Sequence, residues 1–359
     1  MAASLDKTRR PKFEAAADLF EERIRAGVYG IRGIPGERRL ATELGVSYMS
    51  ARRVVIELVN RRVLRRSPNG RLLPGATVVG KQGLRIGFVI PAFTSQTFLE
   101  IQYELSRLAE ESGGVVRSIT YSTPSDPVIF ESLEGNFDGL FFILPIGAPK
   151  LLLDQLARHR DRVVALWHDL AHLGIPSIVT LPPRFVGKGL DHLCKLGHRR
   201  IDCFNTLPHD AVVADRIRHW RMGLEQRGIE GVLHDEPTEA FQCSITGAYR
   251  TFKSMIERGL NSKAYFCVTA ELARGAIRAC HEAGIRVGHD ISICGFSELS
   301  AAKLMVPSLT TVAEADCKPY LAMGLEWIAT RGEDWKRPLR LEPDDVKLFV
   351  GESTGPAQN

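Results

Sequence analysis

The segment at residues 34–64 constrains the fold of this chain more than any other part of the sequence. Its apolar residues follow a helical period in two short runs separated by a turn. Gly45 suits the C-terminal cap of the first helix, and Ser47 suits the N-cap of the second. The apolar stripes are Leu40, Ala41 and Leu44, and then Ala51, Val54, Val55 and Leu58. This pattern predicts a helix-turn-helix, and the alternative is a solvated amphipathic helix pair.

Five candidate DNA-contacting residues lie near the start of the predicted second helix. They are Tyr48, Met49, Ser50, Arg52 and Arg53. A helix-turn-helix places its base-reading side chains here, because this end of the second helix enters the major groove. Residues 65–73 read RRSPNGRLL, which predicts a hairpin wing. We expect its basic residues, Arg65, Arg66 and Arg71, to reach the DNA backbone or the minor groove.

Five separated elements between residues 11 and 75 resemble the gluconate-repressor (GntR) family of winged helix-turn-helix domains. They are a first helix, Ile34-Pro35 with Glu37-Arg38-x-Leu40-Ala41, the Gly45-Val46-Ser47 turn, an arginine-bearing helix and a basic turn. The resemblance implies that the DNA-contacting positions are Arg38, Ser47, Ser50, Arg52 and Gly70. Gly36 stands where the family usually has serine. Tyr48 replaces an arginine that commonly reads guanine, which leaves the operator preference at that base open.

The basic charge is confined to this N-terminal segment. Residues 1–75 carry a net charge of +8 and the remaining residues carry −3, although the whole chain has only +5. This asymmetry is typical of a nucleic-acid-binding domain joined to a domain that does not bind nucleic acid. A length of 359 residues also suggests more than one domain.

The cysteine pattern and the N-terminal sequence both indicate a cytoplasmic protein. Seven cysteines occur without any CxxC pair and mostly within apolar runs, which predicts reduced, buried thiols and no metal site. The N-terminus lacks the apolar stretch of a signal peptide. No apolar run approaches the ~18 residues that a spanning helix needs. We therefore expect no cofactor, metal or membrane partner.

Strands and helices alternate from Leu84 to the C-terminus in two successive cycles. The expected strands are 84–90, 115–121, 138–144, 163–167, 177–181, 201–205, 264–268, 291–296, 309–313, 338–341 and 346–350. The expected helices are 97–112, 127–134, 151–158, 185–196, 212–228, 243–259, 271–283 and 315–330. Such alternation predicts an α/β domain of two lobes with parallel sheets, and a ligand site in the cleft between them.

This second part resembles the effector domain of the lactose/galactose-repressor family, which is periplasmic-binding-protein-like. Six motifs carry the resemblance in order: DGLFFILP (138–145), HLCKLGHRRID (192–202), Arg216 with Trp220, Gly223 and Leu224, ELARGAIRACHEAGIRVGHDISICGF (271–296), PSLTTV (307–312) and GEST (351–354). The resemblance implies a sensor that binds a small effector between its lobes and forms a dimer through them.

The residues that usually bind the effector are only partly retained. Arg216 matches the arginine that holds ligand hydroxyls in the family, whereas Ala270 occupies the place of a carboxylate, with Glu271 adjacent. Ser297 replaces an aspartate, and Leu181 and Pro182 stand where an Asp-Asn pair is usual. Such acids and amides normally accept sugar hydroxyls. Their loss implies either an altered ligand or a pocket that has lost its ligand.

Other pocket candidates follow the carboxyl ends of strands. Phe93, Thr94, Ser95 and Gln96 come after the first strand, and Trp167, His168 and Asp169 come after the fourth. Trp167 could stack on a sugar ring or belong to the core. His168 and Asp169 could bind ligand or form a solvated turn. His198 is expected to be structural, at a helix-to-strand turn.

We therefore predict a small α+β winged helix-turn-helix domain (1–75), a linker (76–83) and a two-lobed α/β effector domain (84–359). The predicted function is a sequence-specific transcriptional repressor, a homodimer on a palindromic operator, controlled by a sugar-like effector. An enzyme is disfavoured, because the sequence has no GxGxxG after a strand, no P-loop and no nucleophile elbow. The remaining alternative is a constitutive DNA-binding dimer whose sensor-like domain has lost its ligand.

Overall fold

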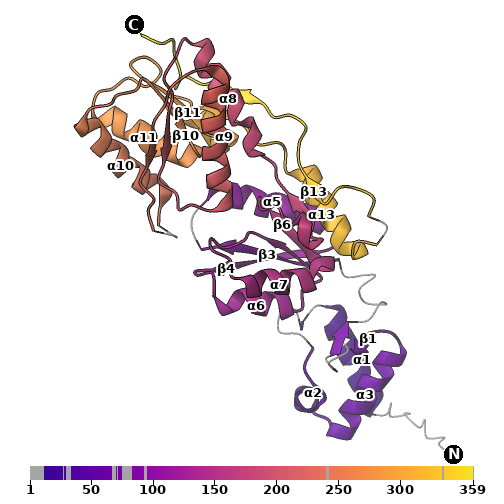
Figure 1. Ribbon diagram of the computed structural model, residues 1–359. Coiled ribbons are helices and arrows are strands. Elements are labelled where there is room, and N and C mark those ends of the chain that lie inside the picture. The colour runs from indigo at the N-terminus through magenta and orange to yellow at the C-terminus, as the bar shows by residue number, and fades with distance from the viewer. Residues whose placement is uncertain are drawn as a thin grey trace, which may run out of the picture.

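The structure is a computed structural model, and Figure 1 shows its arrangement. The residues that it describes are 12–26, 28–29, 34–66, 70, 72–74, 83–92, 95–239, 242–333 and 335–358. Arg71, Phe93 and Thr94, and most of the predicted linker, lie outside this part of the chain.

The N-terminal unit consists of three helices and an antiparallel hairpin. Its elements are α1 (Lys12–Arg25), α2 (Glu37–Leu44), α3 (Tyr48–Asn60), β1 (Leu64–Arg66) and β2 (Leu72–Pro74). The apolar stripes predicted from the sequence pack into one core around Phe20, Leu40, Val54, Val55 and Leu58, all fully buried. The two predicted helices therefore form one packed unit rather than a solvated pair.

The predicted caps of these helices are confirmed. Gly45 ends α2 with φ of 62°, a left-handed conformation that glycine adopts without steric cost. The Ser47 hydroxyl accepts a hydrogen bond from the Ser50 amide over 3.1 Å and so caps α3. Gly36, at the start of α2, makes no side-chain capping bond, as expected where glycine stands in the place of serine.

Two six-stranded sheets form the two lobes of the second part. The first lobe has the order β13-β7-β6-β5-β3-β4, and the second has β14-β12-β11-β10-β8-β9. The first sheet is built from β3 (Arg85–Pro91), β4 (Val115–Tyr121), β5 (Gly139–Phe142), β6 (Val163–Leu166), β7 (Ser177–Ile178) and β13 (Arg340–Leu341). The second is built from β8 (Asp202–Asn205), β9 (Leu233–Asp235), β10 (Ala264–Cys267), β11 (Ser292–Phe296), β12 (Thr310–Val312) and β14 (Leu348–Phe349). All pairings within these sheets are parallel except β12 with β14, which confirms the predicted α/β class.

Helices cover both faces of each sheet. In the first lobe, α5 (Gln96–Glu111) and α13 (Lys318–Thr330) share one apolar cluster with Ile86 and Phe88 of β3. On the other face, α6 (Pro127–Glu134) and α7 (Lys150–Arg158) share a cluster with Val89. Neighbouring β3 residues thus point to opposite faces, as the period of a strand requires. The helices of the second lobe are α8 (Val186–Lys195), α9 (Ala211–Arg227), α10 (Ser244–Arg258), α11 (Ala270–Glu282) and α12 (Leu299–Leu304).

The chain passes between the lobes three times, at residues 179–182, 313–317 and 342–347. The sequence pattern had suggested two consecutive cycles, but β13 returns to the first sheet beside β7. The strand predicted at 177–181 is therefore only two residues long, because its remainder is a crossing segment. The short elements β9 and α12 were not predicted from the sequence.

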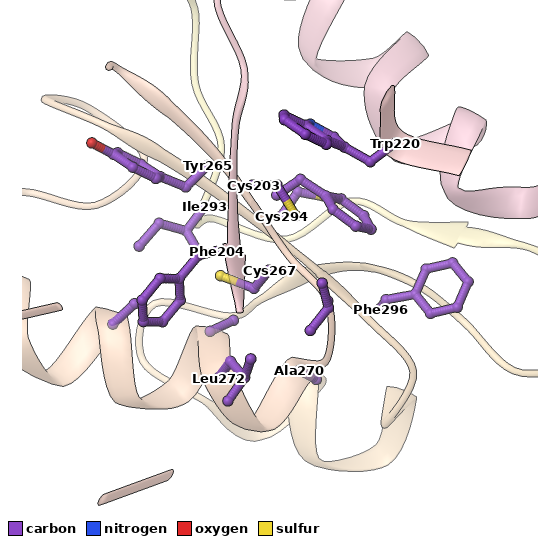
Figure 2. Close-up of a cluster of buried hydrophobic side chains, with 14 of the residues drawn as sticks. Cys203, Phe204, Trp220, Tyr265, Cys267, Ala270, Leu272, Ile293, Cys294 and Phe296 are labelled. Atoms are coloured by element: carbon purple, nitrogen blue, oxygen red, sulfur yellow. The ribbon is translucent and has the colours of Figure 1, made fainter. Parts of the chain in front are cut away.

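A close-packed apolar core fills the second lobe (Figure 2). Cys203, Cys267 and Cys294 lie on neighbouring strands of its sheet, where burial raises the pKa of each thiol above its ordinary value. All seven cysteines are free thiols. Cys243 is an exception to the predicted burial: it is exposed, because it precedes α10 at the surface.

Within the described ranges, no helix combines the length and the apolarity needed to cross a lipid bilayer.

Candidate functional site

The start of α3 forms one candidate site, because it presents side chains to solvent. Tyr48 and Met49 are 44% and 62% exposed, although both are large apolar residues. Arg52 on α3, Arg38 on α2 and Arg65 on β1 are exposed as well. The structure therefore brings Tyr48, Met49, Arg52, Arg38 and Arg65 onto the surface formed by α2, α3 and the hairpin.

Some of these side chains already have partners within the domain. Arg66 forms an ion pair of 2.5 Å with Glu37, which also accepts a hydrogen bond from the Tyr48 hydroxyl over 3.1 Å. Arg53 lies over the ring of Phe13 at 4.9 Å. Gly70 has φ of 80°, and its carbonyl accepts a hydrogen bond from Arg66 over 3.4 Å. Arg66 and Tyr48 are thus oriented by Glu37, whereas Arg38 and Arg52 extend into solvent.

The second candidate site is a cavity of about 190 Å³ between the two lobes. The first lobe contributes Ser95, Phe98, Tyr121, Trp167 and His168 to its lining. The second lobe contributes Asp210, Arg216, Glu271, Ser297, Glu298 and Glu314. The structure therefore brings together six of the predicted pocket residues, Ser95, Trp167, His168, Arg216, Glu271 and Ser297.

Two predicted pocket residues lie elsewhere. Ala270 is 1% exposed within the core of the second lobe, because the first residue of α11 faces the sheet (Figure 2). Its neighbour Glu271, about 100° further round the helix, reaches the cavity instead. Gln96 is exposed at the start of α5 and donates to Glu100 over 3.4 Å, on a neighbouring groove outside the cavity.

Trp167 serves both the core and the cavity. Its ring stacks on Phe98 with a centroid distance of 5.3 Å and an interplanar angle of 27°. Its φ of 65° is unusual for a residue with a bulky side chain and marks local strain at the end of β6. The two predicted roles of Trp167 are therefore compatible.

The structure separates His168 from Asp169. His168 lines the cavity, and burial lowers its pKa below the ordinary value, against the opposing charge of Asp210. Asp169 is exposed and accepts from the Ala171 amide over 3.0 Å and from Arg340 over 2.8 Å. His168 is thus a neutral ligand candidate, while Asp169 belongs to a surface turn.

Arg216 is held in place from two sides. It donates to the Val268 carbonyl over 3.0 Å, and its guanidinium lies 4.8 Å from the centre of the Phe296 ring. Its Nε is buried, and among the described residues it has no hydrogen-bond partner. Burial lowers the pKa of Arg216, while the charges of Glu314, Asp210 and Glu271 oppose this change. An unsatisfied donor of this kind is costly unless a ligand or water satisfies it.

Besides Glu239, three acids of the cavity were missed by the sequence analysis: Asp210, Glu298 and Glu314. Glu314 accepts hydrogen bonds from Ser297 and, over 3.4 Å, from Thr180, and burial raises its pKa. Asp210 caps α9 by accepting from the Val213 amide over 2.7 Å. All three follow the ends of strands, so the rule that ligands bind at carboxyl ends could have found them.

Glu298 and Glu271 form a coupled acidic pair. Burial, followed by the charge of Glu271, raises the pKa of Glu298 to about 8. Burial also raises the pKa of Glu271, which is hydrogen-bonded to Glu298. Arg274 contacts Glu298 over 3.0 Å. The pair therefore shares a proton near neutral pH.

The structural role predicted for His198 is confirmed. Its ring Nε2 lies 3.0 Å from the Ser292 hydroxyl and 3.1 Å from the Gly355 carbonyl, and the residue is 4% exposed. It therefore ties the start of the second lobe to the C-terminal segment. Among the residues that the structure covers, no group of acids, histidines and cysteines could hold a metal ion.

Comparison with known proteins gives a consistent result. Residues 190–318 match the periplasmic binding protein-like domain family. The chain is 25% identical over 292 residues to the HTH-type transcriptional regulator DegA of Bacillus subtilis. The aligned region covers 78% of this chain and 84% of DegA. It is 24% identical over 242 residues to the lactose operon repressor of Escherichia coli, with 66% of each chain covered.

Solved structures share the two-lobed fold. The dimeric Lac repressor superimposes with a TM-score of 0.65 at 19% identity, over 77% of this chain and all of that chain (100%). A LacI family regulator from Enterococcus faecium with bound ribose superimposes with a TM-score of 0.63 at 20% identity, over 76% and 100% of the two chains. Together, these comparisons show that the chain contains a periplasmic-binding-protein-like domain and is similar to transcriptional regulators of the LacI family.

Proposed function

We propose that this chain is a cytoplasmic repressor whose N-terminal unit is a winged helix-turn-helix of the gluconate-repressor (GntR) type. The proposed domains are 1–75 for DNA binding, 76–83 for the linker and 84–359 for effector binding and dimerisation. The order of three helices and a hairpin supports this assignment. The observation that carries the function is the lined cavity between two lobes in a chain related to operon repressors.

The DNA head would place the N-terminal end of α3 in a major groove. Arg52 and Arg38 would contact bases and phosphates, with Ser47, Ser50 and Met49 alongside. Tyr48 and Arg66, both oriented by Glu37, would contact the backbone at the edge of the groove. The wing would contribute Arg65, Arg71 and Gly70.

Replacing Arg52 with alanine should weaken operator binding by roughly 1–3 kcal/mol and relax the preference for one base pair. Arg52 is exposed at the reading end of α3, so the substitution should leave the fold intact. The measurement is a selection of bound DNA from a random library, followed by titration of the enriched palindrome. The matched control is Arg218→Ala, an exposed arginine on α9. Equal weakening on all DNA sequences would make Arg52 a phosphate contact only.

The cavity would bind a sugar-like effector, because it combines an aromatic wall with polar acceptors. Trp167 can stack on a ring face, and Asp210, Arg216 and Glu314 can bind hydroxyls. Effector binding would change the closure of the lobes, provided that the effector has different affinities for the two states. The alternative of a constitutive dimer is less favoured, because an arginine, a histidine and several acids are retained along the lining of the cavity between the lobes.

A thermal-shift screen of the full chain against sugars and sugar derivatives tests this function. An effector at about 100 times its dissociation constant should stabilise the native state by about 2.7 kcal/mol. The same compounds should then change the affinity of the chain for its operator. Operator binding without any stabilising compound would favour the constitutive dimer.

A second copy of this chain would bind to an apolar surface that extends over both lobes. On α5, Leu99 and Tyr103 are 58% and 67% exposed, and at the end of α12 and just beyond it, Leu304 and Val306 are 86% and 93% exposed. A hydrogen bond from Ser300 on α12 to Glu100 on α5 joins the two parts of this surface. A partner that contacts both lobes would respond to their relative movement, which is what a homodimeric switch requires.

The double substitution Leu304→Asp with Val306→Asp should raise the dimer dissociation constant about a hundredfold, equivalent to about 2.8 kcal/mol. The reason is that each aspartate would be desolvated in the apolar interface. Analytical ultracentrifugation over a concentration series measures the change. Leu151→Asp on α7, where the side chain is 60% exposed outside this surface, is the control. An unchanged dimer would place the interface elsewhere.

A further inference from the structure

The two walls of the cavity differ in charge. The wall from the second lobe carries Asp210, Glu271, Glu298 and Glu314 against a single lining arginine, Arg216. The wall from the first lobe carries hydroxyl, aromatic and aliphatic groups together with His168, whose lowered pKa leaves it neutral near pH 7. The negative charge is therefore not balanced from the opposite side.

The charged side chains of the cavity indicate the sign of the charge that a ligand should carry. Glu271 and Glu298 hold one proton between them, and Arg274 contacts Glu298 from outside the lining. Burial also raises the pKa of Glu314, and a cationic ligand is the one that favours the ionised form of these acids of the cavity wall, which outnumber Arg216 and Arg274. Glu239 at the mouth of the cavity adds to their number. A neutral ligand would leave any charge of these acids beyond that of the two arginines buried and unpaired, which is unfavourable in a site of low polarity.

The hydrogen-bonding capacity of the wall is also incomplete. One oxygen of Asp210 caps α9, while in the described part of the chain the other has no hydrogen-bond donor. The Nε of Arg216 lacks an acceptor, as shown above. The wall thus offers an acceptor for an ammonium group and a donor for a hydroxyl oxygen of the same ligand.

The opposite wall is suited to a ring. Trp167 stacks on Phe98, which fixes its indole at the edge of the cavity. An aromatic face of this kind binds the apolar C–H face of a sugar ring and also favours a nearby cation. A flexible aliphatic amine would use the acids but not this face.

We propose that the effector is an amino sugar: a hydroxylated ring that carries one ammonium group. The ammonium would lie against Asp210 and Glu271, the hydroxyls would bind Arg216 and Glu314, and the ring would cover Trp167. This inference rests on the proposed function, in which the cavity is the effector site, and it names the chemical class of the effector.

Proton linkage gives the inference a distinctive signature. Glu298 interacts with Glu271 and Arg274 on α11, with Glu314 after β12 and with Glu100 on α5. A cation bound beside Glu271 favours the ionised form of both members of the pair, so binding releases a proton from it. A neutral sugar has no such effect.

The experiment is isothermal titration calorimetry of the full chain with glucosamine, galactosamine and mannosamine. The ligand controls are the parent hexoses, which lack the charge without added bulk, the N-acetyl derivatives, in which a larger neutral amide replaces the ammonium, and glucuronate. We expect at least one amino sugar to bind about tenfold more tightly than its parent and its N-acetyl form near pH 7. Repetition in two buffers of different ionisation enthalpy should show proton release.

Substitutions of single acids test which residues cause the preference for the amino sugar. Glu271→Gln and Asp210→Asn remove one charge each with little change of shape, and the side-chain carbonyl of the asparagine in Asp210→Asn would keep the acceptor that caps α9. Each should reduce the preference for the amino sugar about tenfold, and Glu271→Gln should abolish proton release. Glu257→Gln, on the exposed face of α10 outside the cavity, should change neither.

The outcomes separate this inference from the proposed function. Tighter binding of the neutral parents, or of glucuronate, would overturn the amino-sugar assignment and leave the effector-controlled repressor intact. Failure of every compound to bind would overturn the assignment as well, and operator titration would then show whether the chain still acts as a DNA-binding dimer. An amino-sugar preference that persists in both charge-removing variants would also contradict it.

Discussion

Replacing Phe204 with alanine is expected to lower the free energy of unfolding of the second lobe by about 3–5 kcal/mol. Phe204 is fully buried on β8, between β10 and β9, and its ring meets Phe252 edge-on with centroids 5.1 Å apart (Figure 2). Truncation removes the transfer free energy of the ring and leaves a cavity that a strand hydrogen-bonded on both sides cannot close. Denaturant titration followed by circular dichroism and tryptophan fluorescence measures the loss.

Two further variants test whether the loss of stability comes from the void left by the Phe204 ring or from a general sensitivity of the fold to substitution. Phe204→Leu keeps most of the volume and should cost less than about 1.5 kcal/mol. Leu151→Ala removes an apolar side chain that is 60% exposed on α7 and should stay within about 0.5 kcal/mol of the parent chain. A loss below about 1 kcal/mol for Phe204→Ala would mean that the core of this lobe is not packed as described.

Replacing Asp202 with alanine should cost about 3 kcal/mol, because Asp202 is a fully buried acid with three donors. It accepts from Arg200 over 3.1 Å, from the Val232 amide over 3.0 Å and from His234 over 2.8 Å. Without it, the Val232 amide loses its acceptor, and β8 loses a link to the segment that leads into β9. Asp202→Asn keeps the shape and one acceptor, so its effect should be intermediate.

The same residue predicts a dependence of stability on pH. Burial alone would raise the pKa of Asp202, but the hydrogen bonds from His234 and Val232 and the charge of Arg200 outweigh it and lower the pKa below 3.8. A depressed pKa in the folded state contributes stability above the unfolded value, and this contribution is lost as the pH falls through the folded value. Denaturation series at decreasing pH should therefore show a shallower loss in Asp202→Ala than in the parent chain. Parallel curves for the two proteins would exclude Asp202 as an acid-sensitive group.

The positions of the pocket residues show how far the sequence analysis could go. Strand order indicated Ser95, Trp167 and His168, and the family resemblance indicated Arg216, Glu271 and Ser297; these six residues do line one cavity. Ala270 was placed one residue away from the correct position, because a family pattern does not show which side of α11 faces the sheet. Glu314 was missed although it follows the end of β12, because the sequence does not show that the segment after this strand crosses between the lobes beside the cavity.

The sequence by itself determined much of the local structure and the α/β class of the second part of the chain. Helical periods, caps such as Gly45 and Ser47, and alternating strands depend on interactions between near neighbours in the chain, which a sequence displays directly. Only the tertiary structure decided three features. They are the return of the chain to the first sheet at β13, the proton shared by Glu271 and Glu298, and the excess of acids over arginines in the cavity. These features depend on burial and on distances between residues far apart in sequence, and desolvation and Coulomb energies follow from such distances rather than from residue order.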